Sequence, residues 1–341
     1  MKYRYLGKTG LLVSRLCLGT MSFGAEDWGC DRSAALKLIT RYLDAGGNFI
    51  DTADIYAGGA SEQIVGEALK SSRREAVVLL TKCFFRTGSG PLDKGLSRKH
   101  ILASCEASLK RLGTEYIDIY MIHGADPFTA CDETMRALDD LIHQGKVRYL
   151  GCSNLFAWQI LKANGISALH NLTPLSCGQY LYNLIDRDAE REVLPACADQ
   201  GMGFLCWSPL GGGLLTGKYG GAQTPAQGTR AHYRLKIDGV RFWHARGFEV
   251  AAKLQDISTR RSLSPARLAI AWPLHDRRVT SVIIGVKNTA QLEENMVPGD
   301  WDLPPEILSE LDQATAPDLG HLAQFERHAY ASAFGDEEFR P

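Results

Sequence analysis

The sequence predicts an α/β fold in which eight parallel strands close into a (β/α)8 TIM barrel, and three observations lead to this prediction. Short apolar runs rich in β-branched residues recur at intervals of roughly 30 residues along the 341-residue chain. Several of these runs are hydrophobic throughout, as expected of strands that helices cover on both faces. Amphipathic stretches separate the runs, so that strand and helix alternate as in consecutive βαβ units. A doubly wound open sheet has the same alternation and is the alternative fold.

Eight segments are expected to form the barrel strands, because each is apolar and bounded by turn residues. They are Arg15–Thr20, Asn48–Asp51, Val77–Lys82, Ile117–His123, Val147–Ser153, Ser176–Tyr180, Gly203–Trp207 and Val282–Gly285. The third contains Val-Val-Leu-Leu and the fourth contains Ile-Asp-Ile-Tyr-Met-Ile, which favours burial in a parallel sheet.

Helices are expected between the strands because apolar residues recur there at helical spacing. Ser61 and Ser97 stand where a helix N-cap is expected, each just before an amphipathic run. Gly113 is expected to end the second of these helices in the left-handed conformation. The same pattern predicts helices over Asp132–His143, Phe156–Ala163 and Asp188–Asp199.

Three segments lie outside the eight units. Residues 2–13 are expected to form a β-hairpin before the first barrel strand. Residues 217–247 contain glycine and arginine and are weakly periodic, so they are expected to form a long functional loop at the barrel mouth. The tail, residues 317–341, has no strong pattern. With the barrel over residues 14–316, these segments predict one domain over residues 1–341.

The near-neutral charge of the chain argues against several classes of function. With 38 Lys and Arg against 39 Asp and Glu, the net charge is −1, which gives no basic footprint for nucleic acid or anionic membrane. The apolar stretch near residues 16–25 is too short to span a bilayer, and the N-terminus does not resemble a secretory leader. Nine cysteines form no CxxC pair, so neither a disulfide frame nor a metal site is expected. A cytoplasmic protein without nucleic-acid, membrane or metal partners is therefore predicted, as a monomer or a homo-oligomer.

Four polar residues are expected to meet at the barrel mouth, where the reactive side chains of such folds lie. Asp51, Lys82 and His123 end the second, third and fourth strands, and Tyr56 lies on the loop after Asp51. Each alone is consistent with a turn cap, a solvated lysine, a structural histidine or a packing tyrosine, but together they make the polar cluster that an active site needs. An ammonium lowers the pKa of a neighbouring phenol, and a carboxylate holds the ammonium in place. The cluster is therefore predicted to exchange a proton with a carbonyl or alcohol oxygen, which His123 would orient.

Five motifs carry a resemblance to a known family. Residues 49–56 read FIDTADIY and are soon followed by Ser-Glu, and further motifs read LLTK, MIH, GKVRYLGCSN and WSPLG at residues 79–82, 121–123, 145–154 and 207–211. In this set and spacing, up to about Asn295, the chain resembles the aldo-keto reductases. It is most similar to the longer, bacterial-type members that are related to channel β-subunit-like reductases.

The resemblance implies a (β/α)8 barrel that binds NADP across its mouth and transfers a hydride between the nicotinamide and a carbonyl or alcohol carbon. It implies that Tyr56 is the general acid/base, that Lys82 and Asp51 tune it, and that His123 orients the substrate. Lys287 matches a position where the family commonly pairs Arg or Lys with the 2′-phosphate, so NADP is expected to be preferred. Because Lys lacks the bidentate fork of Arg, NAD remains possible.

Position within the resemblance implies further cofactor contacts. Ser153, Asn154 and Gln179 match residues that hold the carboxamide, and Trp207 stands where an aromatic side chain stacks on the nicotinamide ring. The glycine-rich run after the seventh strand is expected to approach the pyrophosphate, and the helix start near Lys287 to bind the adenosine phosphate. The remaining predicted cofactor residues are Gly19, Thr20, Met21, Asp51, Ser208, Pro209, Leu210, Gly212, Gly217, Lys218, Gly285, Gln291 and Asn295.

The same glycine-rich run also matches part of a nucleotide-triphosphate P-loop. Gly212 to Lys218 spells GxxxxGK, but Tyr219 stands where a P-loop carries the Ser or Thr that binds Mg²⁺. The P-loop interpretation is therefore disfavoured.

The substrate is expected to be a small-molecule carbonyl or alcohol compound, namely an aldehyde, a ketone, a sugar or the corresponding alcohol. Trp28, Tyr56, His123 and Gly124 are predicted to bind it. A glycine directly after His123 leaves room beside the catalytic residues, which favours a bulky substrate such as a sugar or a cyclic ketone.

Two other classes of function remain as alternatives. The same barrel occurs in regulatory subunits of membrane channels, which bind the cofactor with little turnover. This alternative is disfavoured because the barrel begins at once and leaves no long N-terminal segment for interaction. A barrel aldolase or isomerase that uses Lys82 to form a Schiff base is the second alternative.

Overall fold

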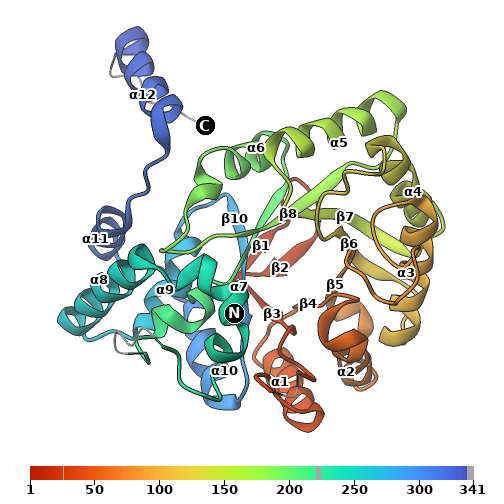
Figure 1. The fold of residues 1–341 in the computed structure, drawn as a ribbon, viewed down its shortest axis with the longest axis horizontal. Coiled ribbons are helices and arrows are strands. Elements are labelled where there is room, and N and C mark those ends of the chain that lie inside the picture. Colours follow the sequence, from red (N-terminus) through yellow and green to blue (C-terminus); the bar gives the residue numbers. More distant parts are fainter. Residues whose placement is uncertain (26, 220–223, 336–341) are drawn as a thin grey trace.

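The computed structural model describes residues 1–25, 27–219 and 224–335 and shows a closed barrel surrounded by helices (Figure 1). Its eight strands are parallel and pair in the order β3-β4-β5-β6-β7-β8-β9-β10, with β10 returning to β3. Each barrel strand is followed in the chain by at least one helix. The (β/α)8 prediction is confirmed, and the open-sheet alternative is wrong because the last strand pairs with the first.

All eight predicted strands occur, with small shifts at their ends. Their bounds are β3 Leu16–Gly19, β4 Phe49–Asp51, β5 Val78–Cys83, β6 Ile117–Ile122, β7 Val147–Ser153, β8 Leu175–Leu181, β9 Gly203–Trp207 and β10 Val279–Gly285. β10 begins earlier than predicted because it includes the polar residues Thr280 and Ser281, which are buried. The Ser281 hydroxyl is satisfied there, since it donates a hydrogen bond to the carbonyl of Ser14 at 2.8 Å.

The predicted N-terminal hairpin is present and packs against the barrel. Its strands are β1 Tyr3–Tyr5 and β2 Leu12–Ser14, which pair antiparallel. The turn between them contacts the start of β9, because Lys8 N donates to the carbonyl of Gly201 at 2.8 Å. A Cβ on Gly7, which has a φ of 57°, would lie 2.3 Å from that carbonyl oxygen, so this contact requires glycine.

Helices surround the barrel, except for α12, which projects from the molecule (Figure 1). Those between β3 and β9 are α1 Arg32–Asp44, α2 Ala60–Leu69, α3 Arg98–Leu112, α4 Cys131–His143, α5 Ala157–His170 and α6 Val193–Asp199, and the later ones are α7 Arg230–Phe242, α8 Ala245–Arg261, α9 Pro265–His275, α10 Thr289–Met296, α11 Pro305–Thr315 and α12 Gly320–Phe334. Ser97 caps α3 as predicted, since its hydroxyl accepts from His100 N, and Gly113 ends that helix with a φ of 61°. The predicted cap at Ser61 is wrong. Gly59 holds the N-cap position of α2, and the buried Ser61 hydroxyl bonds instead with Thr20 and Thr52.

Two segments differ from the sequence prediction. The expected loop over 217–247 contains α7, and the tail after Pro317 contains α12, which projects from the rest of the molecule (Figure 1). The periodicity of α7 is hidden because one of its buried positions is charged: Ala231, Asp238 and Phe242 form the buried face. Of these two segments, residues 220–223 and 336–341 lie outside the described part of the chain.

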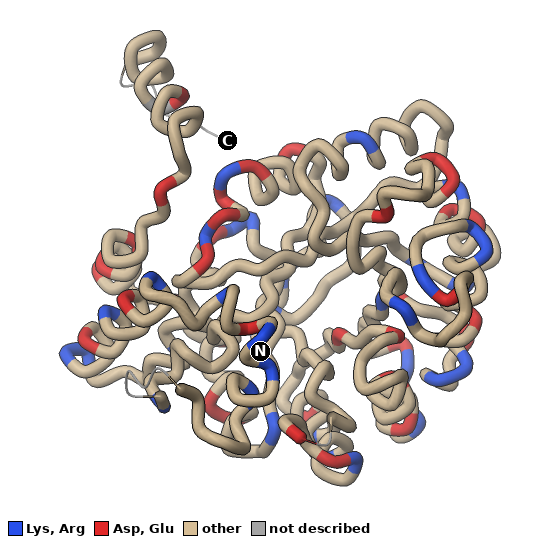
Figure 2. The backbone as a smooth tube through the Cα atoms, viewed as in Figure 1, with Lys and Arg blue, Asp and Glu red and all other residues tan. Residues whose placement is uncertain are grey.

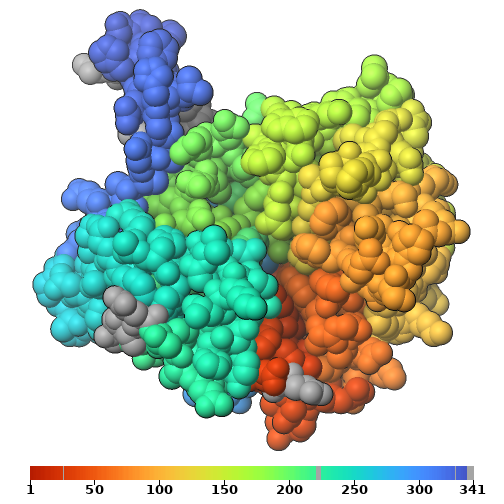
Figure 3. Space-filling view, viewed as in Figure 1, coloured from red at the N-terminus to blue at the C-terminus, as the bar shows by residue number. Residues whose placement is uncertain are grey.

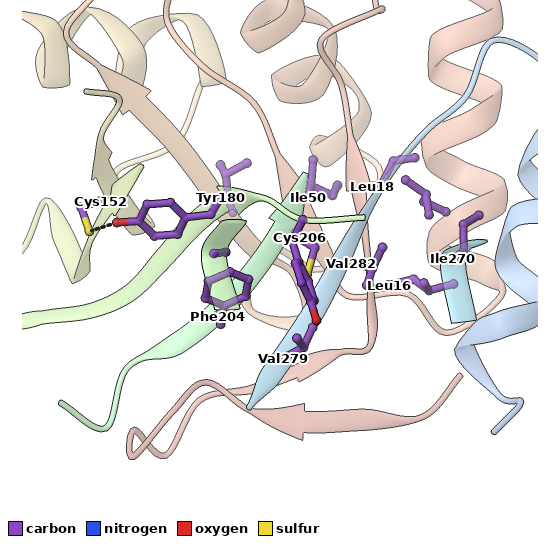
Figure 4. Packing of buried hydrophobic residues seen from close by; sticks show 14 of the residues in the cluster. Leu16, Leu18, Ile50, Cys152, Tyr180, Phe204, Cys206, Ile270, Val279 and Val282 are labelled. Carbon is purple, nitrogen blue, oxygen red and sulfur yellow. Dashed lines mark hydrogen bonds between the residues drawn. The ribbon is translucent and has the colours of Figure 1, made fainter. Parts of the chain in front are cut away.

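The larger hydrophobic cluster lies between the barrel and its helices, and a smaller cluster of strand side chains fills the barrel interior, where Leu6 and Val13 of the hairpin segment join it. Figure 4 shows side chains from several strands meeting in the larger cluster, including Leu16, Ile50 and Val282. The Cys152 thiol lies 3.6 Å from the Tyr180 hydroxyl in the same cluster. Burial raises the pKa of the Cys152 thiol to about 12, so this thiol is unreactive at neutral pH.

The surface carries charges of both signs. Figure 2 shows Lys and Arg interspersed with Asp and Glu over the outer helices. Several form ion pairs between helices, for example Arg261 of α8 with Glu310 of α11 at 3.0 Å. Within residues 1–25, 27–219 and 224–335, we find no helix with the length and apolarity needed to cross a bilayer.

Candidate active site

The ends of three neighbouring strands bring together the predicted acid–base residues. Asp51 is the last residue of β4, Lys82 lies near the end of β5, and His123 directly follows β6. Because β4, β5 and β6 are parallel neighbours, their C-terminal ends meet at the same rim. Tyr56 joins them from the loop after β4, at the start of a short 3₁₀ turn over Tyr56–Gly59.

Lys82 is the centre of the cluster. Its Nζ donates to Asp51 Oδ1 at 2.6 Å, to the carbonyl of Thr52 at 2.8 Å and to the Tyr56 hydroxyl at 3.2 Å. The side chain of Lys82 is fully buried. Burial opposes its charge, but Asp51 and Tyr56 outweigh this effect and raise the pKa of Lys82. The amine therefore stays protonated, which disfavours the Schiff-base alternative.

The pKa of Tyr56 was expected to be lowered, but its net shift is upward. Burial raises the pKa of Tyr56 above its ordinary value, and the nearby carboxylate of Asp51 adds to this increase. Lys82 lowers the pKa as expected, but by less. Tyr56 is therefore a protonated phenol whose oxygen accepts from Lys82, which leaves the phenol hydrogen free to be donated.

His123 is a neutral imidazole beside Tyr56. Burial, followed by the charge of Lys82, lowers the pKa of His123 well below its ordinary value. The His123 ring lies 5.9 Å from the Tyr56 ring and 4.9 Å from the Phe85 ring, centre to centre. Its Nδ1 is buried and has no hydrogen-bond partner in the described part of the chain. A neutral imidazole can donate a hydrogen bond to an oxygen placed between it and Tyr56.

The three predicted carboxamide residues connect directly to this cluster. Gln179 Nε2 donates to Asp51 Oδ1 at 2.7 Å, so this carboxylate oxygen binds both Gln179 and Lys82. Ser153 Oγ donates to the carbonyl of Gln179 at 2.8 Å. Asn154 Nδ2 donates to Ser153 Oγ at 2.9 Å and to the carbonyl of His123 at 3.2 Å. The arrangement fixes Asp51, and with it Lys82.

Sequence reasoning missed a second buried carboxylate, Asp54. It is 3% exposed, and neither carboxylate oxygen has a hydrogen-bond partner in the described part of the chain. Burial, together with the charge of Glu62, raises the pKa of Asp54 to about 7, although Arg111 opposes this. Glu62 itself is satisfied, because it accepts from Thr81 Oγ1 and Arg111 Nε, both at 2.6 Å. The signal for Asp54 in the sequence was its position as the second aspartate of the DTAD motif.

The opposite side of the mouth is formed by the segment after β9. Trp207 ends β9, and a 3₁₀ turn follows over Gly211–Thr216. Gly212 and Gly213 within it have φ of 65° and 98°, a backbone that L side chains rarely adopt. A Cβ on Gly213 would lie 3.0 Å from the Lys218 Nζ, so the glycine keeps the backbone beside this ammonium accessible.

Positive charges gather beyond this turn. Partial desolvation and the charge of Arg230 lower the pKa of Lys218. Partial desolvation, followed by Lys218, lowers the pKa of Lys287, which precedes α10. The backbone near Lys287 forms a helix cap, since Lys287 N donates to Gln291 Oε1 and Gln291 N donates to Asn288 Oδ1, both at 2.9 Å. The cations repel one another, so a bound anion would stabilise all of them.

Sequence reasoning also missed the arginines of α7. The guanidinium carbons of Arg230 and Arg234 lie over the Trp28 ring, and that of Arg241 lies over the Trp207 ring. Their spacings of four and seven residues are those of one helical face, which was the available signal, although the helix is kinked at Arg234, where φ is −112°.

Several predicted site residues have structural roles that are visible in their contacts. Thr20 is fully buried, and its hydroxyl bonds to the carbonyl of Asp51 and to Ser61. A Cβ on Gly19 would lie 2.6 Å from an Ile283 methyl, so this glycine allows β3 and β10 to pack closely.

The other predicted cofactor residues differ in exposure. Pro209 and Asn295 are buried, and Met21, Ser208 and Leu210 are partly buried. Gly217, Gly285 and Gln291 are exposed.

The prediction of free space beside Gly124 is wrong. A Cβ at this position would lie 2.9 Å from the Phe84 ring, so Phe84 fills that space. The remaining predicted substrate residue, Trp28, is partly buried.

Strained backbone is concentrated at the mouth. Ala57, Phe84, Asn154 and Ser208 have positive φ, and they follow the ends of β4, β5, β7 and β9. Such conformations cost of order 1–3 kcal/mol each and are characteristic of functional sites.

The donor set at the mouth fits a nicotinamide dinucleotide. Lys218, Lys287 and Arg230 supply cations for phosphates, and Gly213 leaves the backbone accessible beside one of them. Trp207 presents an indole at the end of β9, the strand that pairs with the strand of Gln179. These features are compatible with an oxidoreductase that binds such a cofactor.

Comparison with known proteins agrees with this class. The Aldo/keto reductase family model matches residues 15–316. The chain is 39% identical to the uncharacterized oxidoreductase YrpG of Bacillus subtilis over 92% of this chain and 95% of that protein, and 33% identical to versiconal hemiacetal acetate reductase of Aspergillus parasiticus over 94% and 99%. It is 38% identical to the probable voltage-gated potassium channel subunit beta of Oryza sativa over 92% and 96%. The chain therefore belongs to the aldo/keto reductase family and is an oxidoreductase.

Proposed function

We propose that this protein is an NADP-dependent reductase of aldehydes and ketones, or the corresponding alcohol dehydrogenase. The observation that carries the proposal is the contact of the buried Lys82 ammonium with the Tyr56 hydroxyl at 3.2 Å, beside the neutral His123. This unit offers a proton from Tyr56 and an orienting donor from His123 to the same substrate oxygen.

Reduction of a carbonyl group adds a hydride to its carbon and a proton to its oxygen. The chemistry that a bound nicotinamide supplies is this hydride exchange. Tyr56 donates the proton through its hydroxyl, and the positive charge of Lys82 stabilises the tyrosinate that forms. Asp51 holds Lys82 in place through the bond at 2.6 Å. In alcohol oxidation the same proton returns to Tyr56.

The cofactor would lie between the two halves of the mouth. Trp207 would stack on the nicotinamide, and Gln179 would bind its carboxamide through the oxygen that its bond to Asp51 leaves available. Lys218 and Arg230 would bind the pyrophosphate, and Lys287 the 2′-phosphate. A single Lys favours NADP over NAD by charge alone, so the preference is expected to be modest.

A regulatory role is the second candidate, favoured by the relative that is named a potassium channel subunit beta. The complete set of Asp51, Tyr56, Lys82 and His123 supports turnover, because Tyr56 and His123 are placed to act on a substrate oxygen, which cofactor binding alone does not require. The nine unpaired cysteines support a location in the reducing cytoplasm.

A substrate panel separates these functions. Uncharged aldehydes, ketones and sugars are mixed with the protein and NADPH or NADH, and cofactor absorbance is followed. We expect turnover of at least one carbonyl compound at 1 s⁻¹ or more in order of magnitude. Cofactor binding without turnover of any compound would favour the regulatory role. Borohydride trapping of substrate on Lys82 would support the Schiff-base alternative instead.

A further inference from the structure

Three arginine side chains of α7 line one side of the barrel mouth. The guanidinium carbons of Arg230 and Arg234 lie 5.7 and 5.3 Å from the centre of the Trp28 ring, and that of Arg241 lies 5.2 Å from the Trp207 ring. Figure 3 shows the teal segment that includes α7 meeting the red N-terminal segment on this face. Two of the arginines therefore contact an aromatic side chain in the segment after the first barrel strand, and the third contacts the aromatic side chain that ends the seventh.

The arginines carry more charge than their partner neutralises. Arg230 Nε lies 2.9 Å from Asp238 Oδ2, and Arg234 Nε lies 3.7 Å from the same buried oxygen. Burial, followed by the charge of Arg230, lowers the pKa of Arg234, and Arg241 acts in the same direction. Arg234 Nε has no hydrogen-bond partner in the described part of the chain. An added anion would complete this site.

The cations at the mouth fall into two groups. Arg230 lowers the pKa of Lys218, and both lower the pKa of Lys287, so these three cations lie near one another. They form the group that fits the cofactor phosphates. Arg234 and Arg241 differ from this group in their partners. Arg230 pairs closely with Asp238, whereas Arg234 Nε has no hydrogen-bond partner in the described part of the chain and Arg241 lies over the Trp207 ring. Both Arg230 and Arg234 lie near enough to Tyr56 for their charges to interact with it.

We propose that Arg234, with Arg241 beside it, binds an anionic group of the substrate, so that the preferred substrates are carbonyl compounds that also carry a carboxylate or a phosphate. A guanidinium suits either group because it donates two parallel hydrogen bonds. The Trp28 ring supports the guanidinium from one side and restricts its orientation. This inference rests on the proposed carbonyl reduction for its reacting group, but the anion site can be tested separately.

The kinetic test uses aldehydes matched in shape and different in charge. One pair is 4-carboxybenzaldehyde and 4-carbamoylbenzaldehyde, and the other is 4-formylphenyl phosphate and 4-methoxybenzaldehyde. The ratio of kcat/KM within each pair measures the preference for charge, and comparison of the pairs distinguishes carboxylate from phosphate. We expect the charged member of at least one pair to be preferred by about tenfold or more.

Variants on α7 assign this preference to a residue. Arg234→Gln should reduce the charged-to-neutral ratio by about 10- to 100-fold, mainly through KM, and Arg234→Lys should restore part of it. Lys236→Gln is the matched control, because Lys236 lies on the same helix with its side chain exposed, and it should leave the ratio unchanged. A ratio that is unchanged in Arg234→Gln, or reduced equally in Lys236→Gln, would overturn the proposal.

A binding measurement separates the anion site from the reaction. Calorimetry with the NADP⁺-saturated protein should show that benzoate or phenyl phosphate binds more tightly than benzamide, and that Arg234→Gln removes the difference. If the parent reduces no aldehyde but still binds the anions more tightly, the proposed reaction is contradicted and the proposed anion site is supported. If aldehydes are reduced without any charge preference, the reaction stands and the anion site fails. A weaker NADPH affinity in Arg234→Gln, equal to its loss of kcat/KM, would make Arg234 a cofactor residue and also overturn the proposal.

Discussion

The two halves of the barrel mouth are built in different ways. In the first half, the ends of β4, β5 and β6 hold Asp51, Lys82 and His123 on short, buried strands, and Lys82 donates all of its hydrogen bonds within the protein. In the second half, Lys218 after β9 is exposed, and Arg230 and Arg234 of α7 share the carboxylate of Asp238. The first half is organised before any ligand binds, whereas the second carries uncompensated charge that suits anions.

The difference indicates a division of labour. Proton transfer needs groups held in fixed positions, which strands of a closed barrel provide. Recognition of a particular cofactor or substrate can vary with the loops that such a scaffold carries. Substitution of the paired charges of the first half should therefore reduce stability and turnover together, whereas substitutions in the second half should change affinity alone.

The largest effect is expected from breaking the buried pair of Asp51 and Lys82. Asp51→Asn or Lys82→Met leaves one buried charge without its partner, which should lower the free energy of unfolding by about 3–5 kcal/mol. Removing both charges in the double variant should recover much of this stability without restoring turnover. Urea unfolding and steady-state kinetics of the three variants provide the measurement. Single variants as stable as the parent would show that the pair is not organised as described.

A pH-dependent effect of a few kcal/mol is expected from Asp54. Its pKa is raised to about 7 in the folded protein, while an unfolded aspartate titrates near 4. Between these values the folded state keeps a proton that the unfolded state releases, so stability falls as the pH rises from about 4 to 7 and stays low above it.

Asp54→Asn removes this titration. It should raise the free energy of unfolding by roughly 2–4 kcal/mol at pH 8 and change it little at pH 4. Denaturant unfolding at the two pH values tests this, with the exposed Asp44→Asn as the control. A variant that is destabilised at pH 8 would show that the ionised carboxylate is favourable in the fold.

A smaller effect is expected from Lys287 in the second half. Lys287→Ala should weaken NADPH binding by about tenfold and NADH binding much less, because only NADPH carries the 2′-phosphate. Lys287→Arg should strengthen the preference through its bidentate fork. Quenching of protein fluorescence gives the two Kd values for each variant. Equal losses of affinity for NADPH and NADH would show that Lys287 does not bind the 2′-phosphate.

The smallest effect is expected outside both halves, in α12. This helix projects from the molecule, and Leu322 and Phe325 on it are exposed (Figure 1). Ending the chain after Asp318 should therefore change the free energy of unfolding by less than about 1 kcal/mol and kcat/KM by less than about twofold. Thermal unfolding and steady-state kinetics test this. A large loss of kcat/KM would show that the tail contributes to the barrel mouth.

The first half could be predicted from the sequence because its signals are local. The eight strands are apolar runs, and the C-terminal ends of parallel neighbours must meet, so the placement of Asp51, Lys82 and His123 followed directly. The net direction of the Tyr56 pKa could not be predicted, because it depends on how burial and two neighbouring charges balance in three dimensions.

The second half was harder to predict because its signals depend on packing. The buried Asp238 hid the periodicity of α7, so its arginines were assigned to a loop. Packing also defeated two predictions in the first half. The space beside Gly124 was misjudged because Phe84, distant in sequence, fills it with a backbone φ of 150° that no local pattern indicates. The prediction that Ser61 caps α2 was also wrong, because its hydroxyl bonds with Thr20 and Thr52, which lie on other segments.

The central claim, that Tyr56 supplies the proton for carbonyl reduction by NADPH, is tested most directly by a single-turnover measurement with NADPH deuterated at the transferred position. The parent should form an alcohol with one deuterium on the former carbonyl carbon. Tyr56→Phe should bind NADPH with the parent's affinity and form this product at least about 100-fold more slowly. Product without deuterium at that carbon, or Tyr56→Phe reacting as fast as the parent, would contradict the account.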